Sequence, residues 1–175
     1  MSRGKSSHKA RFEKWQQLAP VQTRFLSSMV EARLSSLLEA QGFSRVEYSL
    51  RQLDRPVSGR ELEFERWEAS LVDSLTFNFD KYGAPRFQVI FSRREAEQPC
   101  AFLQAGNLVA SRRQYFHFWG KPWWLPAFLW SQDASLRTIV SVEHRLAQAL
   151  DFLATGQRGI NISPAVALTL AIPVA

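Results

Sequence analysis

The fold is decided by one stretch of the sequence, LTFNFDKYGAPRFQVIFS, which spans residues 75–92. Apolar residues recur at every second position on both sides of a central Lys-Tyr-Gly-Ala-Pro segment. A period of two is typical of a β-strand with one buried face, and the Gly-Ala-Pro segment between the runs is turn chemistry of hairpin length. The stretch therefore predicts an antiparallel β-hairpin.

The segment before this hairpin, residues 60–69, fits two structures. Leu62 and Phe64 alternate with glutamates as in a strand, whereas Phe64, Trp67 and Leu71 also fit the spacing of a helix. We favour the strand, because the segments that follow are β-strands and antiparallel hairpins commonly follow one another along the chain. Further strands are expected in residues 46–50, 101–110 and 114–119, with a charged loop in 93–99, while 163–172 fits either a strand or a helix.

Helical patterns flank this strand-rich middle. Apolar residues recur at helical spacing through residues 21–41, and Gly42 stands where a left-handed residue would end the helix. A second long stripe follows Asp133, a candidate N-cap, and stops at Gly156. A shorter helical pattern begins at residue 9.

This order of elements predicts an α+β fold. Strands cluster in the middle of the chain and helices at its ends, so a parallel sheet with alternating helices is disfavoured. We expect a single domain, residues 9–175, with an antiparallel sheet of about four to six strands and two or three long helices covering one face. Residues 1–8 are expected to form a disordered basic tail.

The net charge of +6 is concentrated at the amino terminus. Residues 1–14 carry five basic groups and one acidic group, a net charge of +4, which leaves +2 for the other 161 residues. Such an arm adds phosphate attraction or is simply solvated. The single cysteine, Cys100, excludes an internal disulfide, and neither a secretory signal nor a membrane span is evident, so we expect a cytoplasmic protein.

No catalytic signature stands out. The chain lacks a Gly-rich phosphate loop, a dinucleotide-binding fingerprint and a Gly-x-Ser-x-Gly elbow, which disfavours the common nucleotide-binding enzymes and serine hydrolases. His8, His117, His144 and Cys100 show no ligand spacing, and a thiol–imidazole pair among them has no local support. We therefore name no catalytic residue, metal ligand or cofactor.

An acidic cluster lies within the ambiguous segment and consists of Glu61, Glu63, Glu65 and Glu68. In a strand the first three point to one side and repel one another. We expect a solvated sheet face, or a match for Arg60, Arg66 and a neighbouring basic strand, rather than the carboxylate pair of a glycosidase.

The most unusual segment is Tyr115 to Trp130, which holds eight of the chain's 22 aromatic residues. One inner strand face hides about half of such rings, so the others cover another layer or are exposed. Exposed tryptophan beside arginine is frequent in protein-binding hot spots and in base-stacking surfaces. The candidate interaction surface is Arg112, Arg113, Trp119, Lys121, Trp123, Trp124 and Trp130. The alternative is a long loop that its own aromatics pin to the core.

Residues 21–94 resemble small uncharacterised bacterial α+β proteins. The matching features are Leu37-Leu38 through Gly42-Phe43, where a long helix ends in Gly-Phe, and the antiparallel aromatic strands that follow. Some proteins of this build act as immunity partners of bacterial toxins, and the resemblance carries over no functional residue.

Three functions compete on these grounds. The first is a non-catalytic cytoplasmic module that binds a protein partner or self-associates through the aromatic segment. The second is a nucleic-acid-associated protein that uses the basic tail, Arg112, Arg113 and the tryptophans. The third is an enzyme of unrecognised type, which would need a pocket joining Cys100 or a histidine to carboxylates. No membrane partner is expected.

Overall fold

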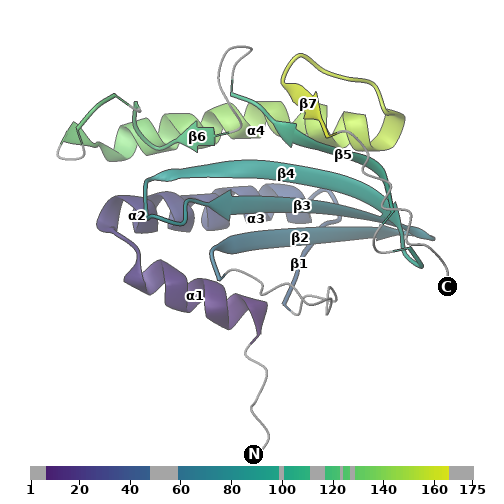
Figure 1. Ribbon diagram of the computed structural model, residues 1–175, viewed down its shortest axis with the longest axis horizontal. Helices are drawn as coiled ribbons and strands as arrows, with labels where there is room; N and C mark the ends of the chain where they lie inside the picture. Colours follow the sequence, from purple (N-terminus) through teal and green to yellow (C-terminus); the bar gives the residue numbers. More distant parts are fainter. Residues whose placement is uncertain are drawn as a thin grey trace, which may run out of the picture.

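A computed structural model of the chain describes residues 7–47, 59–98, 101–110, 117–122, 124–126 and 129–165. Figure 1 shows a twisted sheet of long strands, with helices lying along it. The helical elements are α1 (His8–Leu18), α2 (Val21–Met29), the π-helical turn η1 (Val30–Leu34), α3 (Ser35–Glu39) and α4 (Gln132–Thr155). The strands are β1 (Ser44–Arg45), β2 (Glu61–Glu68), β3 (Leu71–Phe79), β4 (Arg86–Glu95), β5 (Phe102–Leu108), β6 (His117–Trp119) and β7 (Ile162–Pro164).

The strands of the described ranges form one antiparallel sheet in the order β1-β2-β3-β4-β5-β7, and β6 also pairs with β4. Strand β5 pairs with residues 89–94 of β4, while β6 pairs with residues 86–88. The predicted hairpin is β3–β4, with Phe79 opposite Phe87. The predicted α+β class with a single antiparallel sheet is confirmed, and three of its seven strands are only two or three residues long.

The turn of this hairpin is organised by Asp80. Its carboxylate accepts hydrogen bonds from the backbone N–H groups of Tyr82 at 2.8 Å and Ala84 at 3.3 Å, and from Nε of Arg86 at 2.7 Å. Gly83 has a φ of +78°, which favours glycine because it has no Cβ. The turn chemistry expected from the sequence is therefore present in the structure.

The helix predicted over residues 21–41 is α2, η1 and α3 in direct succession. Gly42 follows with a φ of +81°, and the backbone N–H of Phe43 donates to the carbonyl of Leu38 at 3.0 Å. The Phe43 ring is buried, as in the apolar contact that accompanies a left-handed helix cap. The predicted end at Gly42 is confirmed, whereas the π-helical turn was not anticipated.

The core lies between the sheet and the helices α2 to α4, which Figure 1 shows along one side of the sheet. It is rich in phenylalanine, and each buried Phe contributes about 1.5–3 kcal/mol of hydrophobic stabilisation. The largest fully buried aromatic side chains are Phe12, Phe43, Phe64, Phe77, Phe79, Phe87, Phe91 and Phe118.

The strand alternative for residues 60–69 is confirmed, since β2 occupies Glu61–Glu68. The strands expected in 101–110 and 114–119 appear as β5 and β6, although residues 114–116 lie outside the described ranges. Strand β7 supports the strand alternative at Ile162–Pro164, and residues 166–172 lie outside those ranges. Helix α1 begins at His8, one residue earlier than the pattern indicates, with Ser7 as its N-cap.

The charged loop expected in residues 93–99 is wrong for its first three residues. Strand β4 continues to Glu95, because Arg93 lies directly opposite Asp73 of β3 and forms an ion pair with it. A run of charged residues predicts a loop when the oppositely charged residue on the neighbouring strand is not known.

Two element starts also differ from expectation. The strand predicted from Val46 is displaced to β1 at Ser44–Arg45, and residues 48–50 are outside the described ranges. Helix α4 is capped by Ser131, whose Oγ accepts the N–H of Ala134 at 3.2 Å, and Asp133 lies in the first turn instead. A carboxylate in that turn still faces the positive end of the helix dipole favourably.

Candidate functional site

The aromatic segment divides between the core and the surface. Phe118 of β6 is 2% exposed, and its ring stacks on Phe87 of β4 with the centroids 5.7 Å apart. Its neighbour Trp119 points to the opposite side of the strand and is half-buried, as the alternation of a strand requires. One strand therefore supplies both a core anchor and a surface aromatic.

The chain after β6 is tied to α4. The indole N–H of Trp130 donates to Oγ of Ser135 at 3.0 Å, and that hydroxyl donates to the carbonyl of Gly120 at 3.0 Å. The Trp130 ring also meets Phe25 edge to face, with the centroids 5.5 Å apart. A Cβ on Gly120 would lie 2.9 Å from the Ser135 oxygen, so this close approach requires glycine. Both ends of the segment are thus fixed to the helical layer.

Between these anchors, the described residues 121, 122 and 124–126 lie around the ammonium group of Lys121. The ammonium donates to the carbonyl of Pro122 at 3.4 Å and to that of Leu125, while the N–H of Leu125 donates to the carbonyl of Pro122 at 3.0 Å. Trp124 lies in this turn with 66% of its surface exposed. A tryptophan side chain with so much of its surface exposed to water is unusual in a folded protein.

A pocket of about 390 Å³ opens between β6 and the first half of α4. The helix contributes one face at a spacing of three and four residues, and β6 with the following turn contributes the opposite wall. The lining residues are Ala110, His117, Phe118, Trp119, Lys121, Pro122, Ala134, Arg137, Thr138 and Ser141. Thr138 joins the two walls, since its hydroxyl donates to the carbonyl of Trp119 at 2.6 Å.

The electrostatics of this pocket are one-sided. The described residues of its lining include Lys121 and Arg137 and no Asp or Glu. Arg145, one turn beyond Ser141, donates to the backbone carbonyls of Ser141 at 2.7 Å and Ala110 at 3.2 Å, and so adds a third cation at the margin. Within the described part of the chain, none of these three cations forms an ion pair with a carboxylate.

Two cations also lie over the Trp119 ring. The guanidinium carbon of Arg86 is 4.7 Å from the ring centroid, and the ammonium nitrogen of Lys121 is 6.0 Å from it. Arg86 is neutralised by Asp80. Burial, and then the charge of Arg86, lower the pKa of His117 against the opposing effect of Asp80, so this imidazole is neutral near pH 7.

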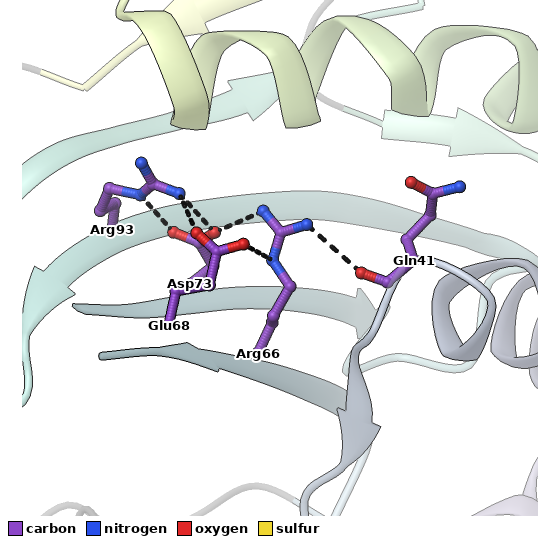
Figure 2. Close-up of polar contacts among 5 residues, drawn as sticks. All are labelled: Gln41, Arg66, Glu68, Asp73 and Arg93. Carbon is purple, nitrogen blue, oxygen red and sulfur yellow. Dashed lines mark hydrogen bonds and ion pairs between the residues drawn. The ribbon is translucent and has the colours of Figure 1, made fainter. Parts of the chain in front are cut away.

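A second group of charges lies at the other end of β4, where it forms a closed cluster. Figure 2 shows Asp73 between Arg93 and Arg66, with Glu68 beside both guanidinium groups. Arg93 donates to the two carboxylate oxygens of Asp73 at 2.6 and 2.8 Å, and Arg66 donates at 2.7 Å. Burial alone would raise the pKa of Asp73, but the hydrogen bonds from Arg93 and Arg66 outweigh it and lower that pKa.

Residues in and beside this closed cluster hydrogen-bond to the carboxyl ends of two helices. Arg66 donates to the backbone carbonyl of Gln41 at 3.3 Å, next to the Gly42 cap, and its guanidinium lies 4.8 Å from the Phe43 ring centroid. On β5, opposite Arg93, the side-chain amide of Gln104 reaches the carboxyl end of α4. In the orientation that gives suitable partners to both the oxygen and the nitrogen of the amide, the nitrogen donates to the carbonyls of Phe152 at 3.1 Å and Leu153 at 2.5 Å. The charges here are used for packing.

The glutamates of β2 fit the expected match with basic residues better than the expected solvated sheet face. Glu65 lies 3.5 Å from Arg94 of β4, and Glu68 lies 3.6 Å from both Arg66 and Arg93. Glu63 is 6% exposed rather than solvated. Arg66 lies on β2 itself, whereas Arg93 and Arg94 come from β4, which lies beyond β3 in the sheet.

The structure brings two of the predicted surface residues, Trp119 and Lys121, into the pocket. Trp124 stands exposed in the adjoining turn, and Trp130 packs on Phe25 as an anchor. The predicted residues Arg112, Arg113 and Trp123 lie outside the described ranges, as does Cys100.

Sequence reasoning missed the helical wall of the pocket. Arg137, Thr138 and Ser141 come from α4, about 20 residues after the aromatic strand. The available signal was a polar stripe at spacings of three and four residues beside the apolar stripe, which alone indicates only a solvent-facing side. His144 is exposed on the same helix and does not line the pocket.

No group of three or more His, Cys, Asp or Glu side chains suited to a metal ion occurs within the ranges that the structure describes. Among the helices described, none has the length and apolar character needed to cross a membrane. Comparison with known proteins gave no match to a family model, a curated protein or a solved structure. The resemblance of residues 21–94 to small bacterial α+β proteins therefore stays a prediction.

Proposed function

We propose that the chain is a non-catalytic protein-binding module of the immunity or accessory type, working in the bacterial cytoplasm, and that it meets its partner at the pocket between β6 and α4. The observation that carries this proposal is the exposed Trp124 beside a pocket whose cations lack carboxylate partners among the residues that the structure describes. Tryptophan and arginine are the residues most enriched in binding hot spots.

The hydrogen bonds around Trp124 support the same function. The turn that presents Trp124 is held by Lys121, and the chain beyond it is fixed by Trp130 and Ser135. A surface that is ordered before contact loses less conformational entropy on binding, so more of its contact energy appears as affinity. An exposed tryptophan on a fixed turn therefore suits recognition better than a mobile one would.

Nucleic-acid binding is the second candidate, favoured by the five basic groups among residues 1–14. Base stacking on Trp119 is less suited to it, because Arg86 already lies over that ring. The two candidates therefore differ in which molecule should be found next to Trp124.

The test places a photo-crosslinking amino acid at position 124 in the full chain, expressed in the cells that normally make it. Position 160 is the matched control, because Ile160 is 71% exposed and lies outside the pocket lining. A discrete protein crosslinked from position 124 and not from position 160 supports the proposal, and a crosslinked second copy of the chain identifies self-association.

Crosslinks to nucleic acid from position 124, or the same products from both positions, overturn the proposal. Trp124→Ala should change the free energy of unfolding, measured by urea denaturation, by less than about 0.5 kcal/mol, because the side chain is exposed. That variant should also abolish a specific crosslink placed at the neighbouring position 126.

A further inference from the structure

We infer that the pocket between β6 and α4 receives an acidic segment of the partner protein, with Arg137 pairing with a carboxylate and an apolar side chain seated beside it. This inference rests on the proposed function and adds the chemistry of the partner.

The pocket offers hydrogen-bond donors that have no acceptors. Arg137 is exposed and makes no hydrogen bond or ion pair with another residue of the described ranges; Asp133, one turn earlier on α4, is not paired with it. Oγ of Ser141 accepts from Arg145, so its own proton is left to donate. Such an arrangement calls for a ligand that is an acceptor and negatively charged.

The planar guanidinium of Arg137 fits a carboxylate in particular. Arginine presents two parallel N–H groups that match the two oxygens of a carboxylate, and such charge-assisted pairs are about twice as strong as neutral hydrogen bonds. Lys121 supports the anion as a fixed charge, because carbonyl groups hold its ammonium in place. The pocket therefore has one group that pairs directly and one that sets the field.

Part of the lining is apolar. Ala110, Phe118, Pro122 and Ala134 contribute it. A volume of about 390 Å³ accommodates a few side chains, at the small end of the range for ligand sites. A peptide that carries carboxylates next to apolar residues satisfies both kinds of lining, whereas a phosphate backbone would leave the apolar part in contact with water.

The Trp119 ring gives the argument against a nucleobase. Stacking needs an open ring face, but Arg86 and Lys121 both lie over this ring. A base stacking on the face that Arg86 covers would have to displace its guanidinium, which Asp80 holds in an ion pair. A carboxylate avoids this cost, because it approaches Arg137 on the helical wall.

The test titrates the full chain with a short peptide of alternating glutamate and leucine, by calorimetry and by two-dimensional amide spectra. A lysine–leucine peptide, inorganic phosphate and single-stranded oligothymidine serve as comparison probes. We expect the acidic peptide to shift amides of β6, of residues 119–125 and of the first half of α4, while the basic peptide shifts none of them.

Arg137→Glu should weaken the acidic peptide at least about tenfold. Arg24→Glu is the matched control, because Arg24 is also an exposed helical arginine without a carboxylate partner and the net charge changes equally. It should alter the affinity by less than about twofold. Both substitutions are on the surface, so unchanged melting curves are expected and verify that each variant is folded.

Equal losses in the two variants would show that net charge alone attracts the peptide, and this would overturn the inference. Tighter binding of oligothymidine at the same amides would overturn it in favour of nucleic acid, and competition by phosphate alone would reduce the site to a simple anion site. If a partner crosslinks at position 124 but binds Arg137→Glu as well as the wild type, the acidic-segment inference fails while the proposed function stands.

Discussion

Two groups of cationic side chains lie at the two ends of β4. Carboxylates pair with both arginines of one group, whereas at the other end Asp80 pairs with Arg86 and leaves Lys121 and Arg137 without an ion pair among the described residues. At one end, Arg66 and Arg93 share Asp73, and Glu68 completes the closed cluster. At the other end, Lys121 and Arg137 line a pocket that has no carboxylate among its described lining residues. Both regions include an arginine over an aromatic ring, Arg66 on Phe43 and Arg86 on Trp119. Arginine beside aromatics therefore does not distinguish packing from recognition; the placement of the acidic residues does.

The sharpest way to break this comparison is to open the closed cluster. Asp73→Ala leaves two arginines, each with less than a fifth of its side chain exposed, without their shared carboxylate. Removing one partner of a buried ion pair costs up to about 3–5 kcal/mol. Glu68 remains 3.6 Å from each arginine, but with 56% of its side chain exposed it compensates their charges only in part. Arg137→Ala, at the open end, should cost less than about 0.5 kcal/mol. Urea denaturation of both variants measures the difference, and equal costs would remove the distinction between the two regions.

Acid should affect the closed cluster next. The pKa of Asp73 in the folded protein lies below its ordinary value of 3.8, so the carboxylate contributes stability above that pH. This contribution is lost as the pH falls below 3.8 through the lower, folded pKa. The measurement is the unfolding free energy against pH for the wild type and Asp73→Asn. A variant whose acid dependence in this range matches that of the wild type would show that Asp73 is not the group responsible.

The cap beside the closed cluster gives a smaller effect. Gly42 has a φ of +81°, and a Cβ at this position would lie 3.5 Å from Cδ of Arg66, an ordinary contact. The cost of Gly42→Ala therefore comes from backbone strain and should be about 1 kcal/mol or slightly more. Gly159→Ala is not a suitable control, because the added Cβ would lie 2.6 Å from Oε1 of Gln148. The control is Ala40→Gly, two residues before the cap. An unchanged urea midpoint for Gly42→Ala would remove the cap from the account of this region.

The smallest expected effect sharpens the comparison at the open end. Because the pKa of His117 is lowered below 6.5, the imidazole gains a proton only as the pH falls below that value. Protonation costs some folding stability, and it also adds a positive charge to the pocket. Affinity for the glutamate–leucine peptide should therefore rise modestly between pH 6.5 and 5, above the range in which the peptide loses its charge. In His117→Gln the rise should disappear, and a rise that persists would assign it to another group.

The local parts of the fold were predictable because their signals are local. The Gly-Ala-Pro turn, the alternation around it and the glycine after Leu38 each act within a few residues, and the structure contains the hairpin and the Gly42 cap. The end of β4 was not predictable in the same way. Arg93 continues the strand because Asp73, 20 residues earlier, receives its charge.

The candidate site was predictable only in part for the same reason. Trp119 and Lys121 stood out by composition, but the pocket exists because α4 lies across β6 and contributes Arg137. Likewise, the fate of each aromatic in the segment depended on remote partners: Phe118 found Phe87, while Trp124 found none in the core. Long-range packing decides which members of an aromatic run are left for a partner.

The short pairing of β6 has a consequence for amide hydrogen exchange. Strands β3 and β4 are hydrogen-bonded on both sides over most of their length, so their amides should exchange only on global unfolding. Strand β6 pairs with β4 over only three residues, and its opening requires the loss of few bonds. The wall of the pocket thus belongs to a region of low local stability next to the most protected strand. An occupant would slow exchange most at residues 117–119, which makes these amides reporters of binding even for a partner not yet identified.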